Sequence, residues 1–153
     1  MDKKYINSFV EAISQVFLNL GFEEISSGSI CVKDSFTCGY NLTIIIGLSG
    51  DIKGNVAISM SYETARKIVS IMMLGMEVSE IDEISVSALG EMTNMVCGQA
   101  VNILSSSNLF IKITPPTIIH GEKIKAIISQ IETSVVAINS SLGTFELNLG
   151  FEI

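Results

Sequence analysis

A carboxylate and a carboxamide lie one helical turn apart in this sequence, at Glu91 and Asn94. Counted at 100° per residue from Ser87, Glu91 falls at about 40° and Asn94 at about 340°. Gly98 falls between them, at about 20°. On a helix the four positions form one narrow stripe, with a carboxylate that can pair with a cation and an amide that both donates and accepts hydrogen bonds. The flanking Ser87 and Gly98 are small.

The residues opposite this stripe are apolar, and together the two faces predict a helix over residues 83–106. The apolar residues fall between about 140° and 220° on the same count, which makes theirs the buried face. The stripe must then point outward from a fixed platform. The apolar positions are Leu89, Met92, Val96, Ala100 and Ile103.

Exposed helix faces often carry Glu and Asn with no function beyond solubility. The composition of this helix nevertheless favours a functional stripe, because Asn and Gly cost some tenths to about 1 kcal/mol against Ala in a helix. Placing Gly90, Asn94 and Gly98 in one helix therefore lowers its stability. Such small residues would let the backbone of another protein approach, and Asn94 could then reach into a neighbouring site.

The elements that must position this helix follow from hydrophobic periodicity. Two further helices are predicted over residues 5–20 and 62–74. Strands joined by short turns predict an antiparallel sheet with the helices packed on it, an α+β fold. The order helix, strands, helix, then helix, strands suggests two related halves, the second without its final helix. The predicted strands span residues 29–33, 41–48, 55–60, 110–114, 117–119, 124–132, 134–139 and 144–153.

Composition excludes several classes of function. The chain has 153 residues, a formal net charge of −7, 48% hydrophobic and 16% charged residues, which fits a single folded domain. The negative charge disfavours nucleic acids and anionic membranes as partners. No apolar run reaches the roughly 18 residues of a spanning helix, and the N-terminus is no signal peptide, so we expect a cytoplasmic protein.

Ligands for a metal site or a disulfide framework are too few. The chain has three cysteines, an odd number, at Cys31, Cys38 and Cys97, and no two of them form a Cys-x-x-Cys pair. The one histidine is His120, so a zinc site lacks ligands. Cys97 is expected to be a packing residue, because no basic partner is near it in sequence. The glycines of residues 47–54 join one strand to another, so this segment predicts a hairpin and not a phosphate-binding loop.

The pattern Ser87-x-x-x-Glu91-x-x-Asn94, followed after a little over twenty residues by Pro116, resembles the motif of the CheC/CheX/FliY phosphatases of bacterial chemotaxis. These proteins remove the phosphoryl group from phosphorylated CheY. The gap between Asn94 and Pro116 is one residue shorter than the family spacing. The resemblance implies one CheX/CheC-like phosphatase domain over residues 1–153. It also extends to residues 9–12, 47–59, 65–73 and 113–116.

CheC and FliY carry a second motif on their first helix, where this chain reads Glu11-Ala12-Ile13-Ser14. The acid is present there and the amide is absent. With one intact motif, the chain resembles CheX-type members more closely than two-site CheC, and this resemblance implies a homodimer.

The resemblance also implies a mechanism. In the family the motif helix docks on the response regulator, where Glu91 would pair with the regulator's lysine and Asn94 would orient water against the phosphoaspartate. Ser87 and Gly98 would belong to the docking surface, with Val101 at its edge or in a dimer contact. The chain would need no cofactor of its own, since Mg²⁺ would be held by the CheY-like partner.

Two alternatives stay open at this point. One is a non-catalytic CheY-binding module like the flagellar switch proteins, which the presence of both Glu91 and Asn94 disfavours. The other is an unrelated α+β domain that binds a small molecule, for which the sequence offers no polar cluster.

Overall fold

The computed structural model describes residues 1–152, and within them the helices are α1 (Lys3–Asn19), α2 (Tyr62–Met72) and α3 (Glu83–Ser105). The predicted helices and strands are present with shifted ends. Ile153, the last residue of the predicted strand 144–153, lies outside the described residues. The strands are β1 (Ile25–Lys33), β2 (Phe36–Cys38), β3 (Leu42–Gly50), β4 (Lys53–Met60), β5 (Ile111–Ile113), β6 (Thr117–His120), β7 (Ala126–Ser129), β8 (Thr133–Ser140) and β9 (Gly143–Glu152).

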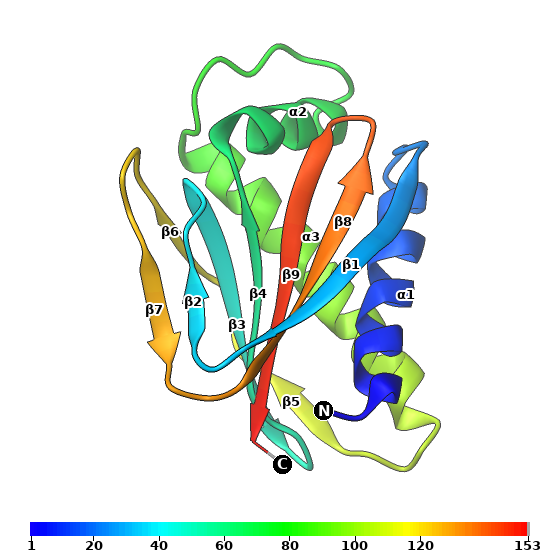
Figure 1. The fold of residues 1–153 in the computed structure, drawn as a ribbon. Coiled ribbons are helices and arrows are strands. Elements are labelled where there is room, and N and C mark those ends of the chain that lie inside the picture. Colours follow the sequence, from blue (N-terminus) through cyan, green and yellow to red (C-terminus); the bar gives the residue numbers. More distant parts are fainter. Residues whose placement is uncertain (153) are drawn as a thin grey trace.

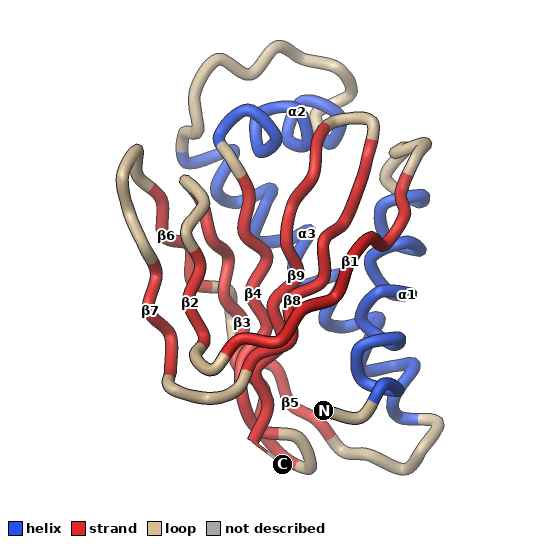
Figure 2. Tube along the Cα trace, viewed as in Figure 1, coloured by secondary structure: helices blue, strands red, loops and turns tan. Residues whose placement is uncertain are grey.

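One antiparallel sheet forms the body of the described chain, in the strand order β1-β8-β9-β4-β3-β5, with β6 paired to β3. Figure 1 shows α1 and α3 side by side on one face of this sheet and α2 across its end. β2 and β7 pair with each other and lie over part of the opposite face, as Figure 2 also shows. The fold is therefore α+β with an antiparallel sheet, as the sequence predicts.

The strand pairing confirms the two related halves. β3 pairs with β4 as β8 pairs with β9, and β1 pairs with β8 as β6 pairs with β3. At the centre, β4 pairs with β9, and β2 pairs with β7. Exchanging the halves leaves this pattern unchanged and exchanges α1 with α3. Among the described elements this exchange leaves out the short β5, which also pairs with β3, and α2, whose absent counterpart is the missing final helix of the second half.

The buried face of α3 anchors it to the sheet. Leu89, Met92, Val96 and Ala100 are fully buried, as predicted, whereas Ile103 is partly buried. Burying an aliphatic side chain of this size stabilises a fold by about 1.5–3 kcal/mol. The helix is thus held by several such contacts, and its rotation about its own axis is set by them.

Local contacts set where α2 ends and α3 begins. The predicted helix 62–74 ends at Met72, because Leu74 and Gly75 take positive φ angles of 59° and 87° that a right-handed helix does not allow. Asp82 caps α3, and its carboxylate accepts hydrogen bonds of 2.9 Å from the backbone N–H and the hydroxyl of Ser85.

Candidate functional site

The predicted stripe lies on the outward face of α3. Ser87 and Glu91 are exposed, and Asn94 and Gly98 are half-buried. Their spacings of four, three and four residues keep them on one side of a continuous helix. The structure thus brings all four predicted positions together on one accessible face.

No ion pair or hydrogen bond within residues 1–152 engages the Glu91 carboxylate or the Asn94 amide. Two nearby polar side chains of α3 make hydrogen bonds to other groups. Thr93 donates to the carbonyl of Leu89 at 2.9 Å, and Gln99 donates to Gln15 on α1 at 2.6 Å. Glu91 and Asn94 therefore present their polar groups to whatever docks on α3.

Gly90 has a role different from the one expected. We expected the small residues of the helix to admit another protein, but Gly90 is buried inside its own chain. A Cβ at this position would lie 3.1 Å from Cγ of Pro116 and 3.6 Å from Cδ1 of Ile118. The distant proline of the motif thus packs directly on the motif helix, beside the stripe. A Cβ on Gly98, in contrast, would meet no atom of residues 1–152 within 4 Å.

Three other residues considered in the sequence make contacts within the described chain. Val101, expected at the edge of the docking surface or in a dimer contact, packs against the hydrophobic core. Cys97 is fully buried, and desolvation raises the pKa of its thiol to about 12, so it is no nucleophile. His120 is a strand residue of β6 whose Nδ1 lies 2.9 Å from the hydroxyl of Tyr62.

The equivalent place on α1 is occupied by internal contacts. Glu11 is exposed and accepts a 3.1 Å hydrogen bond from Gln15, whose own side-chain oxygen accepts from Gln99 on α3. Ser14, where a second amide would stand, is half-buried. The two corresponding helix faces therefore differ, and only α3 presents an unengaged acid and amide.

The same helical count contains a signal that the sequence interpretation missed. Ile84 and Met95 fall at about 60° and 80°, next to Glu91 on the wheel. Both are exposed apolar side chains, at 60% and 37%. They add apolar surface to the outward face of α3, Ile84 before Glu91 along the helix and Met95 after it.

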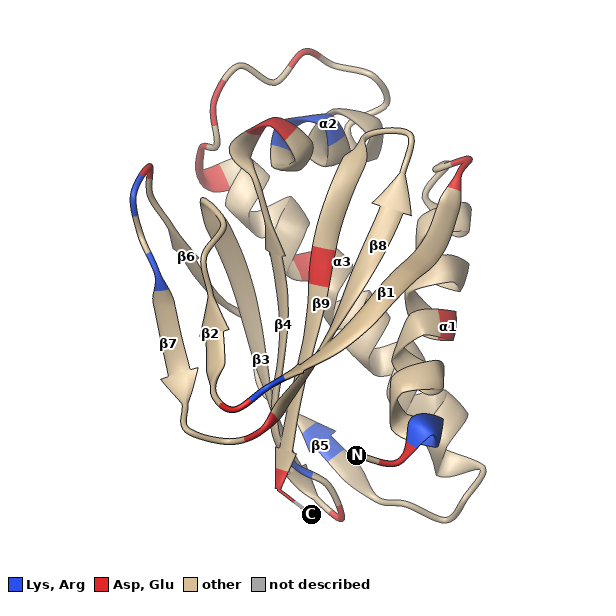
Figure 3. Cartoon of the chain, in the orientation of Figure 1, with Lys and Arg blue, Asp and Glu red and all other residues tan. Residues whose placement is uncertain are grey.

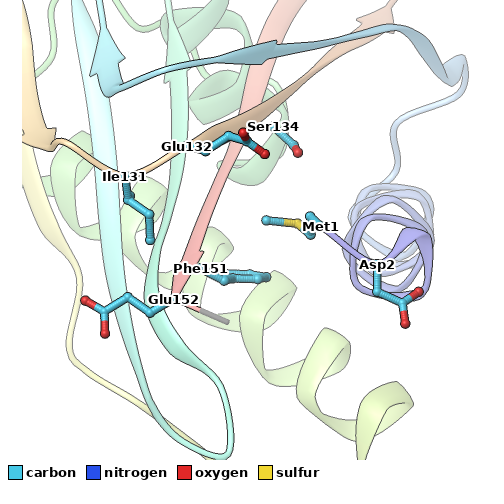
Figure 4. Close-up of a pocket in the computed structure, with 7 residues that line it drawn as sticks. All are labelled: Met1, Asp2, Ile131, Glu132, Ser134, Phe151 and Glu152. Carbon is cyan, nitrogen blue, oxygen red and sulfur yellow. The ribbon is translucent and has the colours of Figure 1, made fainter.

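A hollow of about 660 Å³ lies away from this helix face. Figure 4 shows its lining, which comes from the N-terminus, the turn before β8, β8 itself and the end of β9. None of the predicted site residues lines it. Its lining residues are Met1, Asp2, Ile131, Glu132, Ser134, Phe151 and Glu152.

Across residues 1–152, no group of three or more His, Cys, Asp or Glu side chains is arranged to hold a metal ion. None of the helices in that span is long and apolar enough to cross a membrane.

Comparison with known proteins links this geometry to one family. Residues 42–139 match the family described as chemotaxis phosphatase CheX. The CheY-P phosphatase CheX of Thermotoga maritima is 33% identical over 125 residues, covering 82% of this chain and 81% of the relative.

Solved structures agree with this assignment. A CheC-like superfamily protein from Shewanella sp. PV-4 superposes with a TM-score of 0.89 at 26% identity, covering all of both chains. A Borrelia burgdorferi structure, described as the CheX-CheY-BeF3-Mg²⁺ complex, gives a TM-score of 0.79 at 26% identity, covering 97% of this chain and 98% of that one. On the family match and the identity to the Thermotoga protein, the chain belongs to the CheX family of chemotaxis phosphatases.

Proposed function

We propose that this protein hydrolyses the aspartyl phosphate of a phosphorylated CheY-like response regulator in chemotaxis signalling. The observation that carries the proposal is the unengaged pair of Glu91 and Asn94 on the outward face of a helix fixed by its buried side. Two relatives support the same substrate. The Thermotoga relative is a CheY-P phosphatase, and the Borrelia complex contains both CheX and CheY.

In this proposal the two side chains have different tasks. Glu91 pairs with the regulator's active-site lysine, and this close charge pair sets the register of docking. Asn94, one turn further along α3, enters the regulator's site and orients water for in-line attack on phosphorus. An acyl phosphate is already reactive, so positioning the water and stabilising charge are the main requirements. An amide is sufficient for that task, and Ser87 and Gly98 border the contact.

We place the Mg²⁺ ion of the reaction in the regulator and no cofactor in this chain. When bound there, the ion neutralises charge on the phosphoryl oxygens. Glu91 then keeps its carboxylate for the lysine. This division is consistent with the Borrelia complex, which contains CheY, BeF3 and Mg²⁺ together with CheX.

The proposal includes a homodimer. Among the described strands β1 pairs only with β8, so its other side is an open edge, and it exposes Ile30 at 55% and Val32 at 60%. An open apolar edge favours association. Sedimentation equilibrium of the purified protein measures this directly.

The decisive experiment follows the loss of phosphate from Mg²⁺-bound phosphorylated receivers. The wild-type protein should accelerate the loss for its cognate receiver, and Asn94→Ala should reduce kcat by about a hundredfold or more. Asn102→Ala is the matched control, because Asn102 is an exposed asparagine further along the same helix.

Two results would contradict the proposal. If the wild-type protein binds a receiver without changing its rate of phosphate loss, the protein is a non-catalytic CheY-binding module. If Asn94→Ala keeps full activity, the role given to the amide is wrong.

A further inference from the structure

An apolar patch with an acidic rim lies between α2 and α3. Leu74, Met76 and Ile84 are 97%, 63% and 60% exposed, and we call these three residues the connector patch. Met76 and Ile84 line one hollow of about 210 Å³, and Leu74 lies outside it, two residues before Met76. Large apolar side chains gathered on a surface mark sites of protein contact. Figure 1 shows the connector extending beyond the end of the sheet, where a partner could reach it.

The backbone of Leu74 strengthens this interpretation. Its φ angle is 59°, a left-handed conformation that is unfavourable for a residue with a Cβ and suits glycine or asparagine. The side chain is almost fully exposed, so burial does not compensate for the strain. Neither backbone preference nor packing among residues 1–152 accounts for a leucine here, and a contact with another molecule would account for it.

The surroundings of the connector patch are acidic. From Lys67 to Lys112 the intervening sequence holds five acidic residues and no Lys, Arg or His. Glu77, Glu80 and Asp82 line the hollow with the apolar residues. Two basic residues of α2 lie near this rim. Arg66 shares a neighbouring hollow with Glu80, and Arg66 and Lys67 share another with Glu77, but neither lines this one. Figure 3 shows the acidic positions along the connector and the start of α3. The surface therefore complements an apolar side chain flanked by Lys or Arg.

The residues of the α3 stripe alone offer too little apolar surface for a specific protein interface. A specific interface buries about 800 Å² on each partner, and large apolar or aromatic side chains supply most of its energy. Ser87 and Gly98 are too small to do so. Ile84 precedes Glu91 by seven residues, two turns of α3 or about 10 Å along its axis. A globular domain docked on the stripe would reach the connector.

We infer that the connector patch is a second contact surface for the phosphorylated receiver, which places there an apolar side chain flanked by basic residues. This inference rests on the proposed function. The contact contributes to binding and to the choice among receivers, because it is separate from the groups that act on the phosphate.

The test separates binding from chemistry. Ile84→Ser should raise KM for the cognate phosphorylated receiver by about tenfold or more and leave kcat unchanged. Leu18→Ser is the matched control, since Leu18 is 57% exposed on α1 and lies outside the connector. It should change neither constant.

A second variant guards against unfolding as the explanation. Leu74→Asn should also raise KM, while its melting temperature stays equal to or above that of the wild type, because asparagine tolerates a positive φ. Glu80→Gln tests the acidic rim. If Glu80 attracts a basic partner, KM should rise less with added salt in Glu80→Gln than in the wild type. Glu24→Gln, in the turn before β1, is the control and should keep the salt dependence of the wild type.

The outcomes are distinct. A wild-type protein that accelerates no receiver overturns the proposed function and this inference together. An active wild type whose Ile84→Ser and Leu74→Asn variants keep its KM overturns the inference alone. Loss of a dimer in Ile84→Ser, with KM unchanged, would assign the connector patch to contact between two copies of the chain and likewise overturn the inference.

Discussion

Gly98 is a glycine that the fold of its own chain does not require. A Cβ there would meet no atom of the described part of the chain within 4 Å, and its helix is continuous on both sides. Glycine in a helix costs about 1 kcal/mol relative to alanine. A substitution at Gly98 can therefore separate the stability of the helix from the binding of a partner to its surface.

We expect Gly98→Ala to stabilise the protein by up to about 1 kcal/mol, which raises the melting temperature by about 2–4 °C. If the regulator's backbone packs closely on α3, the same variant raises KM for the phosphorylated receiver. Thermal unfolding and steady-state kinetics on one preparation measure both effects. Gly90→Ala is the comparison, since its Cβ would press on Pro116 inside the chain. An unchanged KM for Gly98→Ala would remove Gly98 from the docking surface.

At the scale of the element, the start of α3 depends on one carboxylate. Hydrogen bonds from the backbone N–H and then the hydroxyl of Ser85 hold the pKa of Asp82 below its ordinary value of 3.8. A lowered pKa means that the folded state favours the ionised form. The resulting stability is present above the pKa of the unfolded chain and is lost as the pH falls through the lower, folded value.

Asp82→Asn should therefore lose less stability than the wild type between neutral and strongly acidic pH. Asparagine still caps the helix through its side-chain oxygen, but it has no carboxylate to protonate. Denaturant unfolding of both proteins over this range of pH gives the comparison. Parallel losses of stability in the two proteins would show that other carboxylates govern the acid response. Asp34→Asn, in the turn between β1 and β2, controls for removal of an exposed negative charge.

At the scale of the whole molecule, the cysteines report on global integrity. Cys31 is exposed on β1, whereas Cys38 and Cys97 are buried. Burial raises the pKa of Cys38 to about 11 and that of Cys97 to about 12, and Glu146 also contributes to the shift at Cys38. Because the thiolate is the reactive form, both buried thiols are protected by pKa as well as by access.

In the native protein at mildly alkaline pH, iodoacetamide should modify Cys31 alone, and in denaturant it should modify all three cysteines. Mass spectrometry after timed quenching follows each site. Modification of Cys97 should proceed at the rate set by opening of the core. If Cys97 reacts as fast as Cys31, the packing of α3 on the sheet described above is incorrect.

Much of the fold was predictable from periodicity, with particular exceptions. The period of α3 correctly places Leu89 and Met92 inside and Glu91 outside. β2 was not predicted. It forms where Phe36 packs on Gly150, whose missing side chain leaves room for the ring. Such a contact between distant segments leaves no local pattern in the sequence.

The candidate site was predictable to the same extent. The helical repeat alone places Ser87, Glu91, Asn94 and Gly98 on one stripe. The structure corrects the interpretation of Gly90. Its missing side chain leaves room for Pro116 of the same chain and not for a partner protein. A count along one helix cannot distinguish these cases, because both require only a small residue.

The amino-acid sequence by itself therefore determined the helices, every strand but β2, the antiparallel α+β class and the stripe on α3, since each depends on the spacing of residues along a single segment. The tertiary structure alone decided the burial of apolar residues that lie outside a regular repeat. Leu74 and Met76 are of types that usually lie in a core, yet both are exposed. Burial depends on whether a distant segment covers a side chain, and among the described residues none covers the connector patch.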